Sequence, residues 1–182
     1  MLSQSWQLVI YLHQHSKYVK RERAIVVQMR RVDSSRDSKE GDHSALQVQY
    51  AKIAQEFDEL GVGVAAMNPP QSVAASHELA VRYLRTMYEV MTALSNVEAD
   101  AKISKSLGRS DALRALALYR QGQSESAAWW FELRVTAKKL HVRIPFRVGL
   151  AAGWRCTACF SSWNMQECTV WSWSWINHRD LK

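Results

Sequence analysis

Apolar residues recur at helical spacing in three successive stretches of the chain, and these stretches predict three amphipathic helices. Residues 73–94 carry a stripe of Val73, His77, Ala80, Leu84, Met87, Met91 and Leu94. Residues 44–67 carry a second stripe of Leu46, Tyr50, Ile53, Phe57, Leu60, Val64 and Met67. A third follows Ser110 and consists of Leu113, Leu116, Ala117, Ala127, Ala128, Phe131 and Val135. Each stripe needs a partner, so the three helices are expected to pack together.

Helix-breaking residues divide these stretches. Ser44 is a suitable N-cap for the first helix, and Asn68-Pro69-Pro70 ends it, because a residue before proline is disfavoured in the α region. Gly61 and Gly63 lie on its seam and predict a frayed or bent last turn. Gly108 is expected to stop the second helix, and Ile144-Pro145 the third. The prediction is an all-α fold, an antiparallel bundle over residues 44–145 with three helices, or four if Gly122 and the polar run 121–126 divide the last one.

Both ends of the chain differ from this central part. Residues 1–43 are expected to form a basic N-terminal arm, with a short element over residues 1–16, a helix in preference to a strand, and a linker over residues 33–42. Residues 146–182 form an irregular tail that holds five of the eight tryptophans and all three cysteines. Trp171, Trp173 and Trp175 alternate at period two, which favours a short strand with one aromatic face. Such a face would be a contact surface or an aggregation risk, unless the tail is read in a non-native frame.

The net charge of +7 is concentrated in the two ends. Residues 1–43 have eight Lys and Arg against five Asp and Glu, residues 44–141 have eleven against ten, and residues 142–182 have five against two. The arm around Lys17, Lys20, Arg21, Arg30 and Arg31 could bind phosphate or lipid headgroups, but an ordinary solvated surface is favoured because Tyr18 is its only stacking candidate. No apolar run reaches the roughly 18 residues of a transmembrane helix, and residues 8–12 do not resemble a secretory signal, which predicts a cytoplasmic protein.

The short motifs of the central part are expected to be structural. Residues 61–66 match the loose dinucleotide pattern G-x-G-x-x-A, but a predicted helix, not a strand, precedes them. His13-x-His15 is too small a ligand set to hold a metal unaided. His77, beside Glu78 on the core stripe, is expected to be a packed, hydrogen-bonded histidine rather than a catalytic base. No catalytic motif is present, so no enzymatic activity is predicted.

The tail contains the one candidate metal site. Cys156, Cys159, Cys168 and His178 could supply three thiolates and an imidazole to a tetrahedral zinc ion. With Trp154 and Asn164, the cysteines resemble part of the Ran-binding-protein-type zinc finger, which implies binding of single-stranded RNA or ubiquitin. The sequence departs from that pattern, because Asn164 is one residue late, Cys168 follows it too soon, and Trp171 stands where the fourth cysteine belongs. Three reduced thiols without zinc are therefore the favoured interpretation.

Residues 44–145 also resemble a second family. Residues 57–60 (Phe-Asp-Glu-Leu), the Asn68-Pro69-Pro70 break, His77 and Leu84 are followed by Trp129-Trp130-x-x-Leu133 and a basic stretch before Ile144-Pro145. This series is similar to poorly characterised helical domains of bacterial extracytoplasmic proteins and lipoproteins. The resemblance implies a helical bundle and a location outside the cytoplasm, and it carries over no catalytic residue.

Taken together, these features predict a small non-catalytic interaction or structural module without a cofactor. Its bundle would use leftover apolar surface for a protein partner or for self-association. The alternative is a nucleic-acid- or zinc-dependent binding module that uses the basic arms and the cysteine tail.

Overall fold

The described part of the protein is all-helical, as the sequence predicts. The computed structural model describes residues 3–36, 42–101 and 108–145. These contain four α-helices and one short 3₁₀ helix: α1 (Gln4–Arg36), α2 (His43–Ala65), η1 (Gln71–Val73), α3 (Ala74–Ala101) and α4 (Gly108–Lys139). No strand occurs in these three ranges. The strand expected around Trp173 lies outside them.

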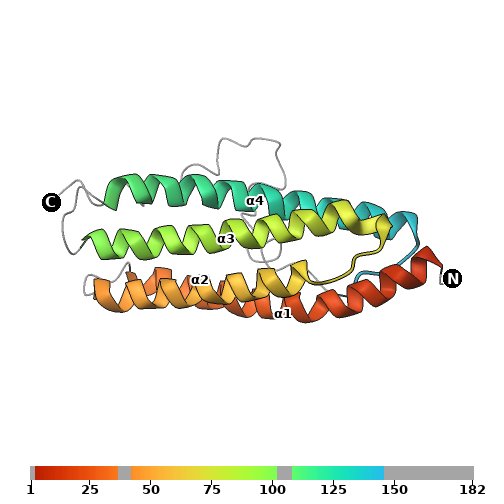
Figure 1. The fold of residues 1–182 in the computed structure, drawn as a ribbon, viewed down its shortest axis with the longest axis horizontal. Helices are drawn as coiled ribbons and strands as arrows, with labels where there is room; N and C mark the ends of the chain where they lie inside the picture. The colour runs from red at the N-terminus through yellow and green to blue at the C-terminus, as the bar shows by residue number, and fades with distance from the viewer. Residues whose placement is uncertain (1–2, 37–41, 102–107, 146–182) are drawn as a thin grey trace.

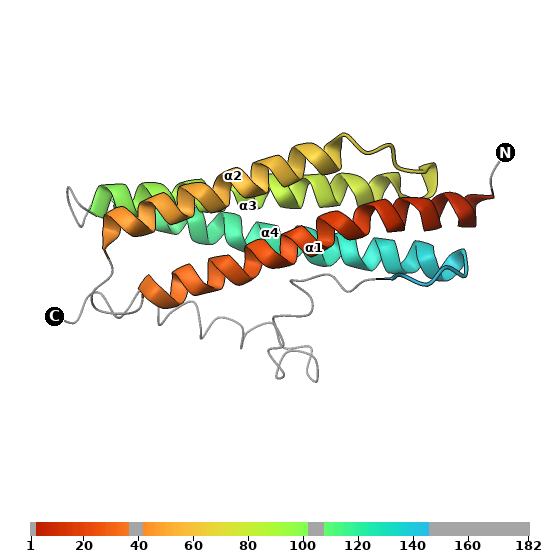
Figure 2. The same ribbon diagram turned by 90° about the horizontal axis from the view of Figure 1, so that it is seen from below.

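The four helices lie side by side along the long axis of the molecule (Figure 1). Helices that follow one another in the chain run in opposite directions, so the start of α1 and the end of α4 lie at the same end (Figures 1 and 2). At that end the Ser5 hydroxyl donates a hydrogen bond to the Leu140 carbonyl at 3.1 Å. Leu8 and Leu12 of α1 are buried there with Leu133 of α4. None of the helices in the described residues combines the length and the apolar character that crossing a bilayer requires.

The sequence stripes of α2 and α3 form the central core. The residues buried from these stripes are Leu46, Tyr50, Ile53, Phe57, Leu60, Val64, Val73, His77, Ala80, Leu84, Met87, Met91 and Leu94. Asp42, not the expected Ser44, caps α2, and its carboxylate accepts a hydrogen bond from the Ser44 amide at 2.8 Å. This satisfies one of the free amides at the helix start. Pro69 and Pro70 separate α2 from η1, as predicted.

Residues 4–36 differ from the expected arm and linker. They form α1, which buries Leu8, Tyr11, Leu12, His15, Val19, Glu22, Ile25, Val26, Met29 and Val32. These positions follow helical spacing, but polar residues among them weaken the apolar pattern on which the prediction depended. Most of the expected arm is therefore a fourth helix packed against the other three, and the first residues of the expected linker are its last turn.

The structure differs from the prediction for α4 in the start of the helix and in its buried face, and it decides between the two alternatives at Gly122. The helix begins at Gly108, which was expected to stop the preceding helix, and it continues through Gly122 without a break. A Cβ at Gly122 would lie 3.2 Å from Met87 Sδ, so glycine here allows close approach to α3. The buried residues of α4 are Ala115, Ser126, Trp129, Leu133 and Ala137, whereas Leu113 and Phe131 of the predicted stripe are exposed.

Gly63 of α2 lies directly against the Tyr18 ring of α1. The helix continues through Gly61 and Gly63 to Ala65 instead of fraying. A Cβ on Gly63 would lie 2.7 Å from Cε1 of Tyr18, closer than two carbon atoms can pack, whereas one on Gly61 would lie 3.6 Å from Leu84 Cβ. The glycine at position 63 thus makes room for the Tyr18 ring.

Candidate functional site

Polar side chains of α1 are buried against α3 and α4. We call Tyr11, His15, Glu22, His77, Tyr83 and Trp129 the polar cluster. Tyr11 and His77 are joined by a hydrogen bond of 3.0 Å between the phenol oxygen and Nδ1 of the imidazole. This bond links α1 to the first turns of α3, and it confirms the expectation that His77 is a packed, hydrogen-bonded histidine.

Aromatic rings surround His15. Its imidazole stacks on Tyr11 with 5.3 Å between ring centroids, and it meets the Trp129 indole edge-on at 5.4 Å. Trp129 in turn stacks on Tyr83 at 6.3 Å. His15 is therefore enclosed by side chains from α1 and α4, and it is almost completely removed from solvent.

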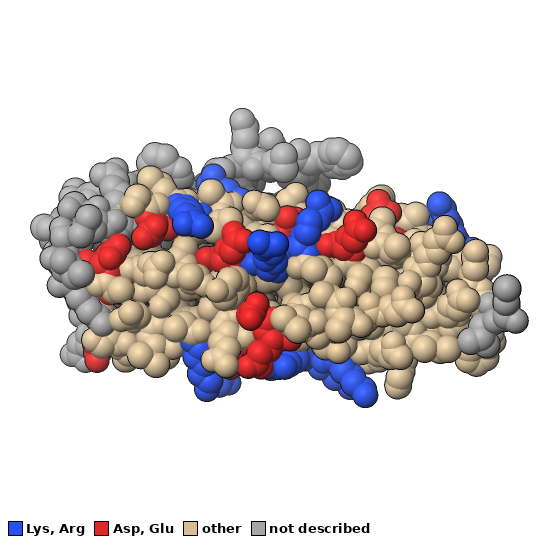
Figure 3. All heavy atoms as spheres, viewed as in Figure 1, with Lys and Arg blue, Asp and Glu red and all other residues tan. Residues whose placement is uncertain are grey.

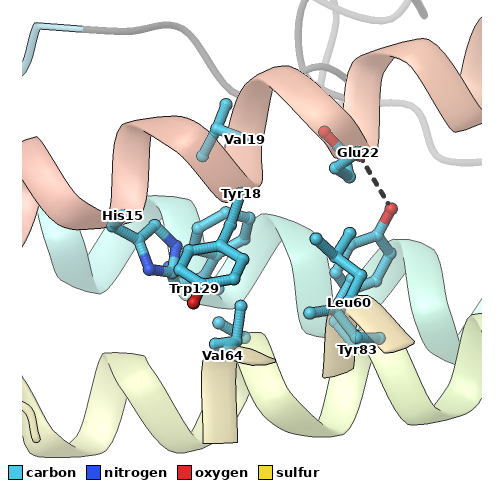
Figure 4. A pocket seen from close by; sticks show the side chains of 10 residues that line it. His15, Tyr18, Val19, Glu22, Leu60, Val64, Tyr83 and Trp129 are labelled. Carbon is cyan, nitrogen blue, oxygen red and sulfur yellow. Dashed lines mark hydrogen bonds between the residues drawn. The ribbon is translucent and has the colours of Figure 1, made fainter. Parts of the chain in front are cut away.

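Glu22 of α1 and Tyr83 of α3 form the other end of the cluster. The Tyr83 hydroxyl donates a hydrogen bond to Glu22 Oε1 at 3.0 Å (Figure 4). His15, Glu22, Tyr83 and Trp129 line a cavity together with Tyr18 and aliphatic side chains (Figure 4). The volume of this cavity is about 10 Å³, which is room for about one water molecule. A space of this size does not admit a metabolite.

Burial changes the ionisation of the polar cluster. Burial, together with the charge of the nearby His77, lowers the pKa of His15 to about 4. Burial also lowers the pKa of His77, although the Glu78 carboxylate opposes this. The pKa of the Tyr83 phenol is raised by burial and by the Glu22 carboxylate beside it. Near pH 7 both imidazoles and the phenol are therefore neutral, so the cluster holds α1 on the bundle without burying a positive charge.

A separate polar contact joins the start of α2 to the end of α3. His43 Nδ1 lies 2.6 Å from Oε2 of Glu98, whose side chain is fully buried. Among the residues that the structure describes, no group of three or more His, Cys, Asp or Glu side chains is arranged to hold a metal ion.

No family model, curated protein or solved structure matches this chain. The site must therefore be interpreted from its own geometry.

Among the residues singled out in the sequence, some lie outside the described part of the chain and others are not brought to one site. Cys156, Cys159, Cys168 and His178 lie outside the described residues, and the zinc site they suggest stays a prediction that metal analysis of the purified protein tests. His13 is exposed while His15 is buried, so these two imidazoles do not face one site. The G-x-G-x-x-A segment lies within α2, not between a strand and a helix.

Two exposed helix faces remain, and sequence analysis had considered only the cations of the second as a binding surface. The first is the outer face of α4, defined by the exposed residues Leu113, Ala117, Ala127 and Phe131, which sequence analysis assigned to the core. The second is the outer face of α1, where exposed apolar residues precede exposed cations. Along the lower edge of the view in Figure 3, where α1 and α2 lie in Figure 1, Lys and Arg side chains project from the body. The helical spacing of the sequence places the residues of each surface on one helix face. Only the packing of the helices decides whether that face is buried or exposed.

Proposed function

We propose that the protein is a non-catalytic interaction module that pairs with a second copy of itself through the outer face of α4. The observation that carries this proposal is the exposure of large apolar side chains on that face. Phe131 is 65% exposed and Leu113 is 52% exposed. Exposed apolar side chains on one helix face are typical of surfaces that associate with a partner. The small size of the interior cavity also favours a function on the surface.

The outer face of α4 is nearly symmetric about its middle. Leu113 and Phe131 lie equally far from Gly122 in the sequence, and so do Ala117 and Ala127. In an antiparallel pair of α4 helices, Leu113 of each copy would meet Phe131 of the other, and Ala117 would meet Ala127. A twofold interface of this kind requires a face that complements itself. The pattern of this face therefore supports a second copy as the partner.

The sizes of the side chains suit close helix pairing. Ala117, Ser124 and Ala127 are exposed and small, so two backbones can approach at the middle of the face. Leu113 and Phe131 lie about 27 Å apart along the helix at about 1.5 Å per residue, one at each end of the small residues. Arg120, opposite Ser124 of the second copy, can extend its charge to the solvent. The pairing thus places apolar anchors at both ends without burying a charge.

Sedimentation velocity of the full chain over a concentration series tests the proposal. We expect a dimer that dissociates on dilution. Phe131→Glu removes both Phe131 anchors and places two carboxylates in the interface, and it should weaken the dimer by at least about 30-fold, the lower limit for loss of a hot-spot side chain. Val48→Glu is the matched control, because Val48 is 68% exposed but lies on α2. Circular dichroism should show unchanged helix in both variants.

Disulfide trapping tests the register. In a background with the three cysteines replaced by serine, Ala117→Cys chains mixed with Ala127→Cys chains should form a mixed disulfide, because these positions meet in the antiparallel pair. Val48→Cys chains should not cross-link efficiently with either. A wild-type chain that is monomeric at every concentration would overturn the proposal. Equal weakening by Phe131→Glu and Val48→Glu would overturn the assignment to α4.

A further inference from the structure

All exposed charges on the described side chains of α1 are positive. Lys17, Lys20, Arg21, Arg30 and Arg31 are exposed. The two acidic residues of the helix are turned into the bundle, where Glu22 accepts a hydrogen bond from Tyr83 at 3.0 Å and Asp33 accepts one from Tyr50 at 2.9 Å. The one exposed carboxylate bonded to these cations is Glu59 of α2, which binds Arg21 at 2.5 Å. The outer side of α1 is therefore positively charged, and of its exposed cations only Arg21 forms an ion pair with an acidic residue in the described part of the chain.

Exposed apolar side chains precede these cations on the same face. Trp6 is 62% exposed, Val9 42% and Ile10 43%. From Trp6 the exposed residues continue in steps of three and four through His13, Lys17, Lys20, Ala24, Val27 and Arg31, which is the spacing of one helix face. An aromatic and two aliphatic side chains thus share one continuous surface with a row of cations.

We propose that this outer face of α1 binds the surface of an anionic lipid bilayer. The cations would contact the phosphate groups of the lipids, and Trp6, Val9 and Ile10 would enter the boundary between headgroups and acyl chains. The opposite side of α1 is fixed in the core by Leu8 and by the Tyr11–His77 hydrogen bond. The binding face is therefore preformed, and docking requires no folding step.

The apolar residues favour a lipid surface over a nucleic acid. A phosphate backbone would satisfy the cations, but it offers no apolar environment to Val9 and Ile10. Base stacking would require aromatic side chains among the cations, and Tyr18 there is half-buried against Gly63. Tryptophan is typical of membrane–water interfaces, where its ring lies at the level of the headgroups. The combination on α1 therefore matches a bilayer surface better than a polynucleotide.

Vesicle co-sedimentation of the full chain tests this inference. We expect binding to phosphatidylcholine vesicles that contain about 30% phosphatidylglycerol, little binding to pure phosphatidylcholine, and loss of binding as salt screens the charges. Replacing Lys17 and Lys20 together by alanine should lower the partition coefficient about 25-fold, at roughly fivefold for each cation. Trp6→Ser should lower it about threefold or more.

The matched control removes the same net charge elsewhere. Lys52→Ala combined with Arg114→Ala removes exposed cations from α2 and α4 and should change the partition coefficient by no more than about twofold. Equal loss in the two double variants would overturn the assignment to α1, and so would equal binding to neutral and anionic vesicles. Binding of duplex RNA or DNA that depends on Lys17 and Lys20, without vesicle binding, would replace the lipid with a polynucleotide. None of these results depends on dimerisation through α4.

Discussion

Acidification from pH 7 to about pH 4.5 is expected to destabilise the bundle through His15. This imidazole is enclosed between α1 and α4, where a positive charge would lose its hydration. The Tyr11 and Tyr18 rings of α1 and the Trp129 ring of α4 contact it, and the charge of His77 of α3 opposes its protonation. The Glu22 carboxylate lines the same cavity but accepts a hydrogen bond from Tyr83, and the pKa of His15 is lowered despite it. Protonation of His15 therefore works against the packing of α1.

The magnitude follows from the two pKa values. In the folded protein the pKa of His15 is lowered from 6.5 to about 4. Above pH 6.5 the imidazole is neutral in both states and contributes no pH dependence. Between pH 6.5 and pH 4 the unfolded chain binds the proton and the folded chain does not, so stability falls by about 1.4 kcal/mol per pH unit. At pH 4.5 the loss from His15 is about 2.5 kcal/mol, and the lowered pKa of His77 acts in the same direction.

Urea denaturation followed by circular dichroism at the two pH values measures this loss. His15→Gln keeps a polar side chain of similar size but cannot gain the charge. We expect the difference in unfolding free energy between pH 7 and pH 4.5 to be about 2.5 kcal/mol smaller in His15→Gln than in the natural chain. His13→Gln is the control, because His13 is exposed on the same helix. Its pH dependence should equal that of the natural chain.

Each variant is compared with itself at the two pH values. The effect of the substitution on packing is the same at both pH values and therefore cancels from the difference in unfolding free energy. The reasoning would be refuted if the natural chain and His15→Gln lost the same stability on acidification. It would also be refuted if His13→Gln reduced the pH dependence as much as His15→Gln.

Two further predictions concern the contacts of α1. Gly63→Ala should destabilise the protein or leave it unchanged, because its Cβ would meet Tyr18 at 2.7 Å. Gly61→Ala should instead stabilise the protein by about 0.5–1 kcal/mol through helix propensity. Thermal melts of both variants measure the two effects, and equal shifts in melting temperature would contradict the steric argument. Tyr83→Phe removes the buried hydrogen bond to Glu22 and should cost about 1–3 kcal/mol. Chemical denaturation measures that cost, and a change below about 0.5 kcal/mol would mean that the bond contributes little.

The core of α2 and α3 could be predicted from the sequence because apolar residues at helical spacing form most of their buried faces. Leu46, Ile53 and Phe57 in α2, like Leu84 and Met87 in α3, repeat at helical spacing, and each is buried. The proline break was equally readable, since its restriction on the backbone is local. In α4 the helical spacing of apolar residues led to the wrong buried face. Apolar residues occur on more than one of its faces, and only packing against the other helices determines that Leu133 is buried, beside Leu8 and Leu12 of α1, and that Phe131 is exposed.

For α1 the sequence predicted the positive charge, but neither a continuous helix over residues 4–36 nor its place in the bundle. His15 and Glu22 look like solvated residues when the chain is read alone. Burying them costs free energy unless partners neutralise or hydrogen-bond them. Tyr83, which hydrogen-bonds Glu22, is more than sixty residues away from it in the chain. Tertiary structure therefore decided the position of α1 and the two surfaces left exposed, because compensation of buried polar groups depends on residues that only folding brings together.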